Sequence, residues 1–250
     1  MTETTWTLPT PDGKTIYGVT NSSGAGATAA IFMVHGFTGN MYQYPFKRAA
    51  DFLSAKGYDV YRFNLYDGRK GGRNLIDCTL LTHAEDLNTI MAKFGPGYTQ
   101  NFVIGHSYGG PTIMLANPQN ITAASLWDPS YNITQMNKDL PDSITKIGGH
   151  LILNVGISYV LSSSMEEHAG TLDEPACIKL AEAFNAPVQV VLAGDGYYVK
   201  QSHSYHSHGK PENLAKNRQD VVPGTTHCFH EADTCEVLLA KTHAFFQQFL

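Results

Sequence analysis

The stretch N-F-V-I-G-H-S-Y-G-G at residues 101–110 runs from an apolar segment into a serine that has a glycine two positions away on either side. If 101–104 is a buried strand and a helix begins near Gly110, the chain must reverse within a few residues. The residue at the tip then takes a strained backbone conformation, and side chains at Gly105 and Gly109 would collide with neighbouring backbone. The pattern therefore predicts a tight turn that presents Ser107 as a nucleophile.

Strand-like and helix-like segments alternate along most of the chain. Strands are expected at 6–8, 15–19, 29–34, 58–63, 101–104, 122–127, 188–193 and 219–222, and helices at 42–56, 80–94, 111–116, 174–185 and 234–250. The first two strands flank a Pro-Asp-Gly turn, which is typical of an antiparallel pair. The later alternation predicts an α/β fold with a mostly parallel sheet covered by helices on both faces.

The 250 residues suit one large domain with an ample core. Between about residues 129 and 173 the alternation breaks down, which we interpret as a small cap or lid inserted into that domain. The apolar stretch at 150–161, H-L-I-L-N-V-G-I-S-Y-V-L, is expected to be the helix of the cap. The alternative is an ordinary helix that covers the sheet. The stretch is too short to span a bilayer.

Composition excludes several classes of partner. The net charge of −5 and the pI near 6.1 give no basic surface, which argues against nucleic acid or an anionic membrane as the main partner. No signal peptide is visible at the N-terminus, so a cytoplasmic location is expected. Cys78, Cys177, Cys228 and Cys235 are too scattered for a disulfide framework and are expected to be buried thiols.

Several motifs resemble those of a known family. The pattern G-x-S-x-G is the nucleophile elbow of the α/β-hydrolases. The motifs H-G-F-T-G-N at 35–40, T-H-A-E-D-L at 82–87 and G-H-S-Y-G-G resemble the carboxylesterase branch, which includes cinnamoyl and feruloyl esterases and monoacylglycerol lipases. The stretch 194–227 looks more like the platelet-activating-factor acetylhydrolases and polyester hydrolases. The resemblance covers nearly the whole chain and implies a serine esterase that uses neither cofactor nor metal.

A serine hydroxyl needs a base within hydrogen-bond reach. His227 lies between the last predicted strand and the last predicted helix, where the α/β-hydrolase fold keeps its catalytic base, and His230 is the second candidate. His106 is expected to pack beneath the turn. The oxyanion of the intermediate needs backbone donors, which we assign to the N–H groups of Tyr108 and Phe37.

Two aspartates are candidates for the acid that orients the base, and the sequence leaves both open. Asp195 follows the predicted strand at 188–193, but the G-x-x-D spacing of many relatives places the acid at Tyr197 instead. Asp128 ends the preceding strand in an L-W-D-P context similar to that of pancreatic-type lipases and the acetylhydrolases. Its alternative role is that of a turn aspartate before Pro129. We favour Asp128.

By the resemblance, Ser107 attacks the carbonyl of a small-molecule carboxylic ester with a short-to-medium acyl or aryl group, and an acyl-enzyme forms. Phe37, Tyr108, Trp127, Tyr131 and the cap are expected to line the acyl pocket. An acyl thioesterase or acyltransferase would use the same triad. A member of a different class, a non-catalytic small-molecule receptor, could also be built on this fold.

The histidine run H-S-Y-H-S-H contains His203, His206 and His208. The spacing is conceivable for zinc, but no carboxylate or cysteine lies nearby in sequence to complete a tetrahedral set. We interpret the run as an exposed polar loop, with a metal site as the alternative.

Overall fold

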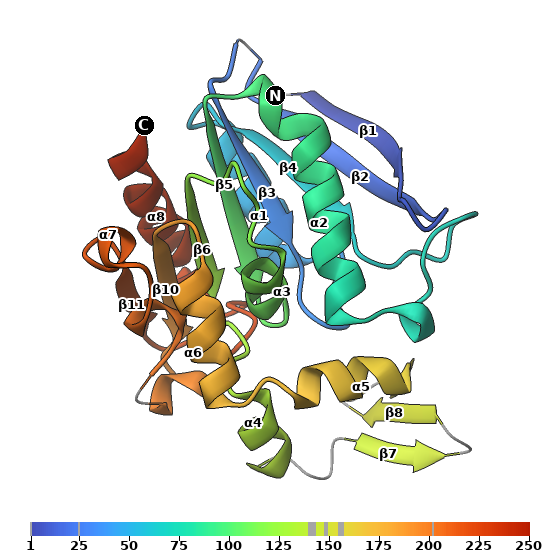
Figure 1. Ribbon diagram of the computed structural model, residues 1–250. Coiled ribbons are helices and arrows are strands. Elements are labelled where there is room, and N and C mark those ends of the chain that lie inside the picture. Colours follow the sequence, from blue (N-terminus) through green and yellow to red (C-terminus); the bar gives the residue numbers. More distant parts are fainter. Residues whose placement is uncertain (1, 25, 140–143, 148–149, 155–157, 202) are drawn as a thin grey trace.

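The protein is described by a computed structural model that covers residues 2–24, 26–139, 144–147, 150–154, 158–201 and 203–250. Eight strands form one sheet in the order β1-β2-β4-β3-β5-β6-β10-β11 (Figure 1). The strands are β1 (Thr2–Pro9), β2 (Thr15–Ser22), β3 (Ala29–Val34), β4 (Asp59–Asn64), β5 (Gln100–His106), β6 (Ala123–Trp127), β10 (Val188–Ala193) and β11 (Arg218–Val222). Neighbours from β4 to β11 are parallel, whereas β1 and β2 add an antiparallel edge. The predicted mostly parallel sheet is confirmed.

Helices cover both faces of the sheet (Figure 1). One face carries α1 (Tyr44–Ser54) and α8 (Thr234–Phe246), and the other carries α2 (Leu80–Phe94), α3 (Gly109–Ala116) and α6 (Glu174–Ala183). In β3, Ile31 and Met33 pack into the α1/α8 core, while Phe32 and Val34 pack into the α2/α3 core. Because both faces are covered, β3 is apolar at every position rather than at alternate ones.

The helix ends follow local chemistry. The side chain of Thr79 accepts a hydrogen bond from the Thr82 N–H (3.1 Å), and that of Thr82 accepts one from the Thr79 N–H (2.9 Å). This reciprocal cap starts α2 by satisfying backbone donors that the helix leaves free. The Asp173 side chain caps the start of α6 in the same way, through the Ala176 N–H.

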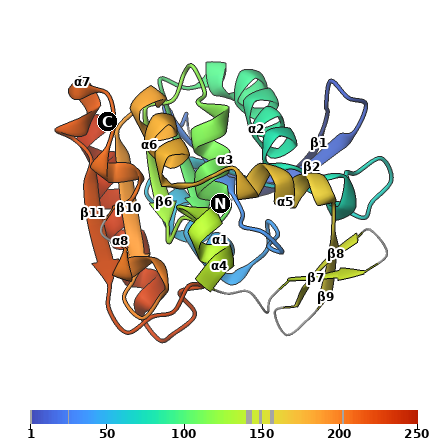
Figure 2. The ribbon, with the colours of Figure 1, turned by 60° about the horizontal axis from the view of Figure 1, so that its bottom comes forward.

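Between β6 and α6 the chain forms an insert at the carboxyl end of the parallel strands (Figures 1 and 2). The insert comprises α4 (Ile133–Asp139), a separate antiparallel sheet of β7 (Ile144–Ile147), β8 (His150–Asn154) and β9 (Ser158–Leu161), and α5 (Ser163–Gly170). In Figure 2, α4 and α5 lie across the strand ends and the small sheet lies beside α5. No helix in the described ranges is long and apolar enough to cross a membrane.

The helix predicted over 150–161 is wrong, because the described residues of that stretch form β8 and β9. Along β9, Ser158 and Val160 are exposed, whereas Leu161 is buried and Tyr159 is half-buried. This repeat of two residues belongs to a strand, and β-branched and aromatic side chains favour it. The stretch is apolar on average, and that average concealed the alternation.

Candidate active site

The turn between β5 and α3 presents Ser107. Its φ is +55°, a left-handed conformation that is strained for a residue with a side chain. A Cβ atom at Gly105 would lie 2.7 Å from the Gly109 carbonyl oxygen, and one at Gly109 would lie 2.3 Å from the Val34 carbonyl oxygen. Both distances are impossible contacts, so the turn requires glycine on either side of Ser107, as the motif predicts.

The loop after β3, residues 35–39, passes directly over this serine: a Cβ atom at Gly36 would lie 2.8 Å from the Cβ of Ser107. His35 Nε2 accepts a hydrogen bond from the Leu65 N–H (3.0 Å), so the Nδ1–H donates to the Gly36 carbonyl (2.8 Å). Burial lowers the pKa of His35 to about 4, which keeps its ring neutral. The Tyr66 hydroxyl donates to the Gly39 carbonyl (2.8 Å). The loop is therefore tied to the chain after β4 at both ends.

The two residues predicted to supply the oxyanion donors come from different segments, Phe37 from the 35–39 loop and Tyr108 from the turn after β5. Phe37 and Tyr108 line the same cavity as Ser107, and their rings pack 5.2 Å apart between centroids. Neither backbone N–H donates to another group in the described part of the chain. Within the described residues, both N–H groups are therefore without an acceptor.

Asp128 meets His227 at the end of β6. The carboxylate oxygen Oδ2 lies 2.6 Å from His227 Nδ1, and Oδ1 accepts the Ala193 N–H at 3.1 Å. Asp128 is fully buried, while the His227 side chain is 37% exposed. A Cβ atom at Gly196 would lie 3.2 Å from Oδ2, so glycine there leaves room for the carboxylate. Asp128 thus fixes the ring of His227 from the buried side.

The other two candidates lie apart from this pair. Asp195 is exposed on the loop after β10, and its backbone N–H bonds to the Thr225 carbonyl (3.0 Å). His230 is exposed as well, with the edge of its ring against Tyr44 at 5.5 Å. The structure brings Asp128, and not Asp195, to the ring of His227.

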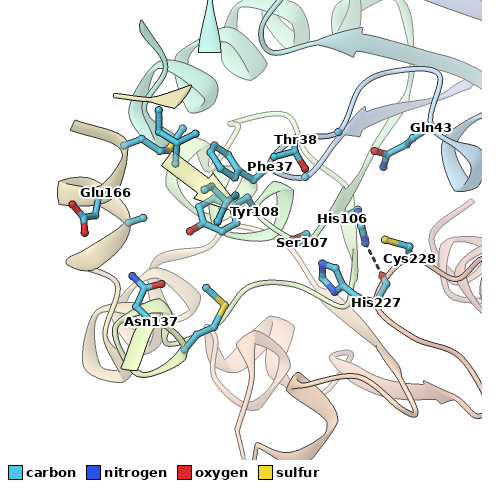
Figure 3. Close-up of a pocket in the computed structure, with 17 residues that line it drawn as sticks. Phe37, Thr38, Gln43, His106, Ser107, Tyr108, Asn137, Glu166, His227 and Cys228 are labelled. Carbon is cyan, nitrogen blue, oxygen red and sulfur yellow. Dashed lines mark hydrogen bonds between the residues drawn. The ribbon is translucent and has the colours of Figure 1, made fainter. Parts of the chain in front are cut away.

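His106 is buried, lines the cavity and contacts the candidate base. Its Nε2–H donates to the His227 carbonyl (2.8 Å), and the two rings lie 4.7 Å apart between centroids (Figure 3). Burial lowers the pKa of His106 to about 3, so the ring stays neutral. His106 therefore holds the backbone of His227 without competing for a proton.

Ser107 and His227 open into one cavity of about 530 Å³ (Figure 3). Apolar side chains from the 35–39 loop, the elbow and the insert form much of its wall, and these are Phe37, Tyr108, Met136, Leu153, Leu161, Met165 and Ala169. Polar side chains stand at its two ends, with Asn137 and Glu166 at one and Gln43 at the other (Figure 3). The cap was expected to line the pocket, but its individual lining residues were not predicted, because only the folded chain brings them beside Ser107.

The prediction that Trp127 and Tyr131 line this cavity is wrong. Trp127 is fully buried, and its Nε1–H donates to Thr242 on α8 (2.9 Å), on the other face of the sheet. Successive side chains of a strand point to opposite faces, so the residue before Asp128 points away from the side that Asp128 faces. Tyr131 is buried against the ring of Tyr205, 5.2 Å away, and borders a separate depression.

The remaining candidates concern metals and thiols. The rings of His203 and His208 lie 6.0 Å apart, but the described residues contain no group of three or more His, Cys, Asp or Glu side chains that could hold a metal ion. All four cysteines are free; three are buried, while Cys228 is half-buried and lines the cavity beside His227.

Comparison with known proteins agrees with this architecture. Residues 29–129 match the family model described as the alpha/beta hydrolase fold. Est1E from Butyrivibrio proteoclasticus, solved with ferulic acid bound, is 19% identical with a TM-score of 0.75, over 95% of this chain and 96% of that one. No curated protein matches the sequence.

Two further solved structures superpose over nearly their full lengths. Alpha/beta hydrolase domain-containing protein 10 from mouse is 16% identical with a TM-score of 0.70, covering 99% of this chain and 100% of that one. The alpha/beta hydrolase GrgF from Penicillium sp. sh18 is 14% identical with a TM-score of 0.73, covering 100% and 99%. The chain is an α/β-hydrolase-fold protein.

Proposed function

We propose that this protein is a serine hydrolase that cleaves carboxylic esters, with Ser107 as nucleophile, His227 as base and Asp128 as the acid. The observation that carries the proposal is the 2.6 Å contact between the buried Asp128 Oδ2 and His227 Nδ1, since His227 lines the same cavity as Ser107. A strained serine, an imidazole and a buried carboxylate match the nucleophile, base and acid of a Ser-His-Asp triad.

In this mechanism the Ser107 hydroxyl attacks the ester carbonyl while His227 Nε2 takes its proton. Asp128 accepts the Nδ1–H of His227, which fixes the tautomer and stabilises the imidazolium. The negative oxygen that forms is bound by the N–H groups of Phe37 and Tyr108. The C–O bond then breaks, and His227 gives its proton to the leaving alcohol. Water next attacks the acyl-enzyme while His227 takes a proton from it, and His227 returns that proton to Ser107 as the acid leaves.

The cavity supports an apolar acyl group. Its volume of about 530 Å³ lies within the usual range for small-molecule sites, and Met136, Leu161 and Met165 supply an apolar wall from the insert. We therefore propose short-to-medium acyl or aryl esters as the substrate class, and we propose that the insert acts as the cap of the acyl pocket.

Hydrolysis of p-nitrophenyl esters of rising acyl length, by wild type and Ser107→Ala, tests the proposal. We expect p-nitrophenol release by wild type and a loss of at least about 10³-fold in Ser107→Ala. If neither protein hydrolyses any of these esters while the esters still raise the melting temperature of the wild-type protein, the protein is a receptor and not a hydrolase. Faster turnover of matched thioesters than of oxygen esters would instead identify a thioesterase.

A further inference from the structure

At one end of the cavity, the side-chain amide of Gln43 has a hydrogen-bond donor without an acceptor. The amide nitrogen Nε2 of Gln43 is buried and has no hydrogen-bond partner among the described residues. Gln43 lines the same cavity as Ser107. A buried donor without an acceptor is costly, and such a group in a cavity wall is commonly satisfied when a ligand binds.

Backbone hydrogen bonds at the start of α1 fix the position of Gln43. Gln43 is the residue before α1, and its carbonyl accepts the Phe46 N–H (3.0 Å) and the Lys47 N–H (3.1 Å). Its side chain makes no capping bond to the helix. A Cβ atom at Gly39 would lie 2.4 Å from the amide oxygen, so the glycine of the 35–39 loop leaves the space that the amide occupies. The amide is therefore seated against the loop that carries the Phe37 donor.

The position of Gln43 relative to the base identifies the part of the substrate that it meets. Figure 3 shows Gln43 on the same side of Ser107 as His227 and Cys228, away from Tyr108 and the insert. His227 must give its proton to the leaving oxygen, so the alcohol part of an ester lies on the His227 side. The acyl part then extends along the apolar wall.

We infer that Gln43 selects esters whose alcohol part carries a second oxygen atom, as an ether or hydroxyl, which accepts a hydrogen bond from Gln43 Nε2. This inference rests on the proposed function and adds a specificity-determining residue on the leaving-group side. An alcohol with only carbon atoms at that position would leave the donor unsatisfied, whereas one with an oxygen atom would satisfy it.

The test compares two butyrate esters, 2-methoxyethyl butyrate and n-butyl butyrate. They differ only in that a methylene group of the butyl ester replaces the ether oxygen. The quantity measured is the ratio of their kcat/KM values. Gln43→Met keeps the length of the side chain and removes the donor, and we expect the ratio to fall by about three- to tenfold. Gln43→Glu replaces the donor with an acceptor, and it should lower the ratio at least as much.

Asn137→Leu is the matched control, because it removes a side-chain amide at the opposite end of the cavity, where the two esters are identical. Its ratio should stay within about twofold of wild type. An unchanged ratio in both Gln43 variants, with p-nitrophenyl butyrate hydrolysis that still depends on Ser107, overturns the inference alone. A wild type that hydrolyses none of the three esters overturns the proposed function and the inference with it.

Discussion

At the scale of single residues, the proposed triad depends on one buried carboxylate, because Asp128 Oδ2 lies 2.6 Å from His227 Nδ1. The motif around Ser107 could be read from the chain, because the glycines are required by contacts within a few residues. The aspartate that orients His227 could not be identified from the sequence, because Asp128 and Asp195 follow neighbouring parallel strands. Their distances to His227 depend on how two loops fold at the same edge of the sheet.

Asp128→Asn and Asp195→Asn are a matched pair, since each replaces a carboxylate with an amide of the same shape. We expect Asp128→Asn to lower kcat/KM for p-nitrophenyl butyrate by about 10³- to 10⁴-fold, because the amide cannot hold the required tautomer of His227. Asp195→Asn should stay within about threefold of wild type, since Asp195 is exposed and apart from the ring. A larger loss in Asp195→Asn than in Asp128→Asn would reverse the assignment.

The close packing of the turn around Ser107 against the end of β3 can be tested by adding a single methyl group. Gly109→Ala would place a Cβ atom 2.3 Å from the Val34 carbonyl oxygen, so the backbone must shift. We expect the free energy of unfolding to fall by about 3 kcal/mol or more, measured by urea denaturation. Gly170→Ala is the control, because a Cβ atom there meets nothing within 4 Å. Equal stability of the two variants would contradict the packing described for the turn.

At the scale of elements, the sequence predicted the strands and helices of the main sheet and failed in the insert. The main strands are continuous apolar runs bounded by turn residues, a strong signal. The run at 150–161 has the length of a helix and a similar composition, and only the exposure of alternate residues in β9 distinguishes a strand. That exposure depends on where the small sheet lies, which local composition does not encode.

The loop at 35–39 offers a test of how an element outside the triad supports the reaction. Tyr66→Phe removes the bond to the Gly39 carbonyl and loosens the loop that carries the Phe37 donor. We expect kcat to fall about tenfold with KM changed less than twofold, because the donor acts on the transition state. Tyr17→Phe also removes a hydroxyl bond to a loop carbonyl, that of Lys70, away from the cavity. An equal fall in kcat in both variants would show that the effect is not specific to this loop.

At the scale of the whole molecule, three buried histidines couple stability to pH. Burial lowers the pKa of His35 to about 4 and those of His83 and His106 to about 3. The unfolded chain takes up these protons near pH 6.5, whereas the folded chain does not until pH 3 to 4. The stability that these neutral rings contribute is therefore fully present above pH 6.5 and is lost as the pH falls to between 4 and 3.

We expect the free energy of unfolding to be lower at pH 5 than at pH 7 by roughly 2 kcal/mol for each of these histidines. His83→Gln should reduce the pH dependence by about one proton, since His83 lies on α2 and is buried. Urea denaturation across this pH range measures both. Parallel pH profiles for wild type and His83→Gln would contradict the assignment.

We propose that His227 and Asp128 activate Ser107 as a nucleophile. The most direct test is the rate at which a p-nitrophenyl alkylphosphonate, which traps an activated serine, adds one phosphonyl group to the protein, followed by intact mass and peptide mapping. We expect one adduct, on Ser107, that forms at least about 100-fold more slowly in Asp128→Asn and at the wild-type rate in Asp195→Asn. An adduct on another residue, or an equal rate in wild type and Asp128→Asn, would contradict this proposal.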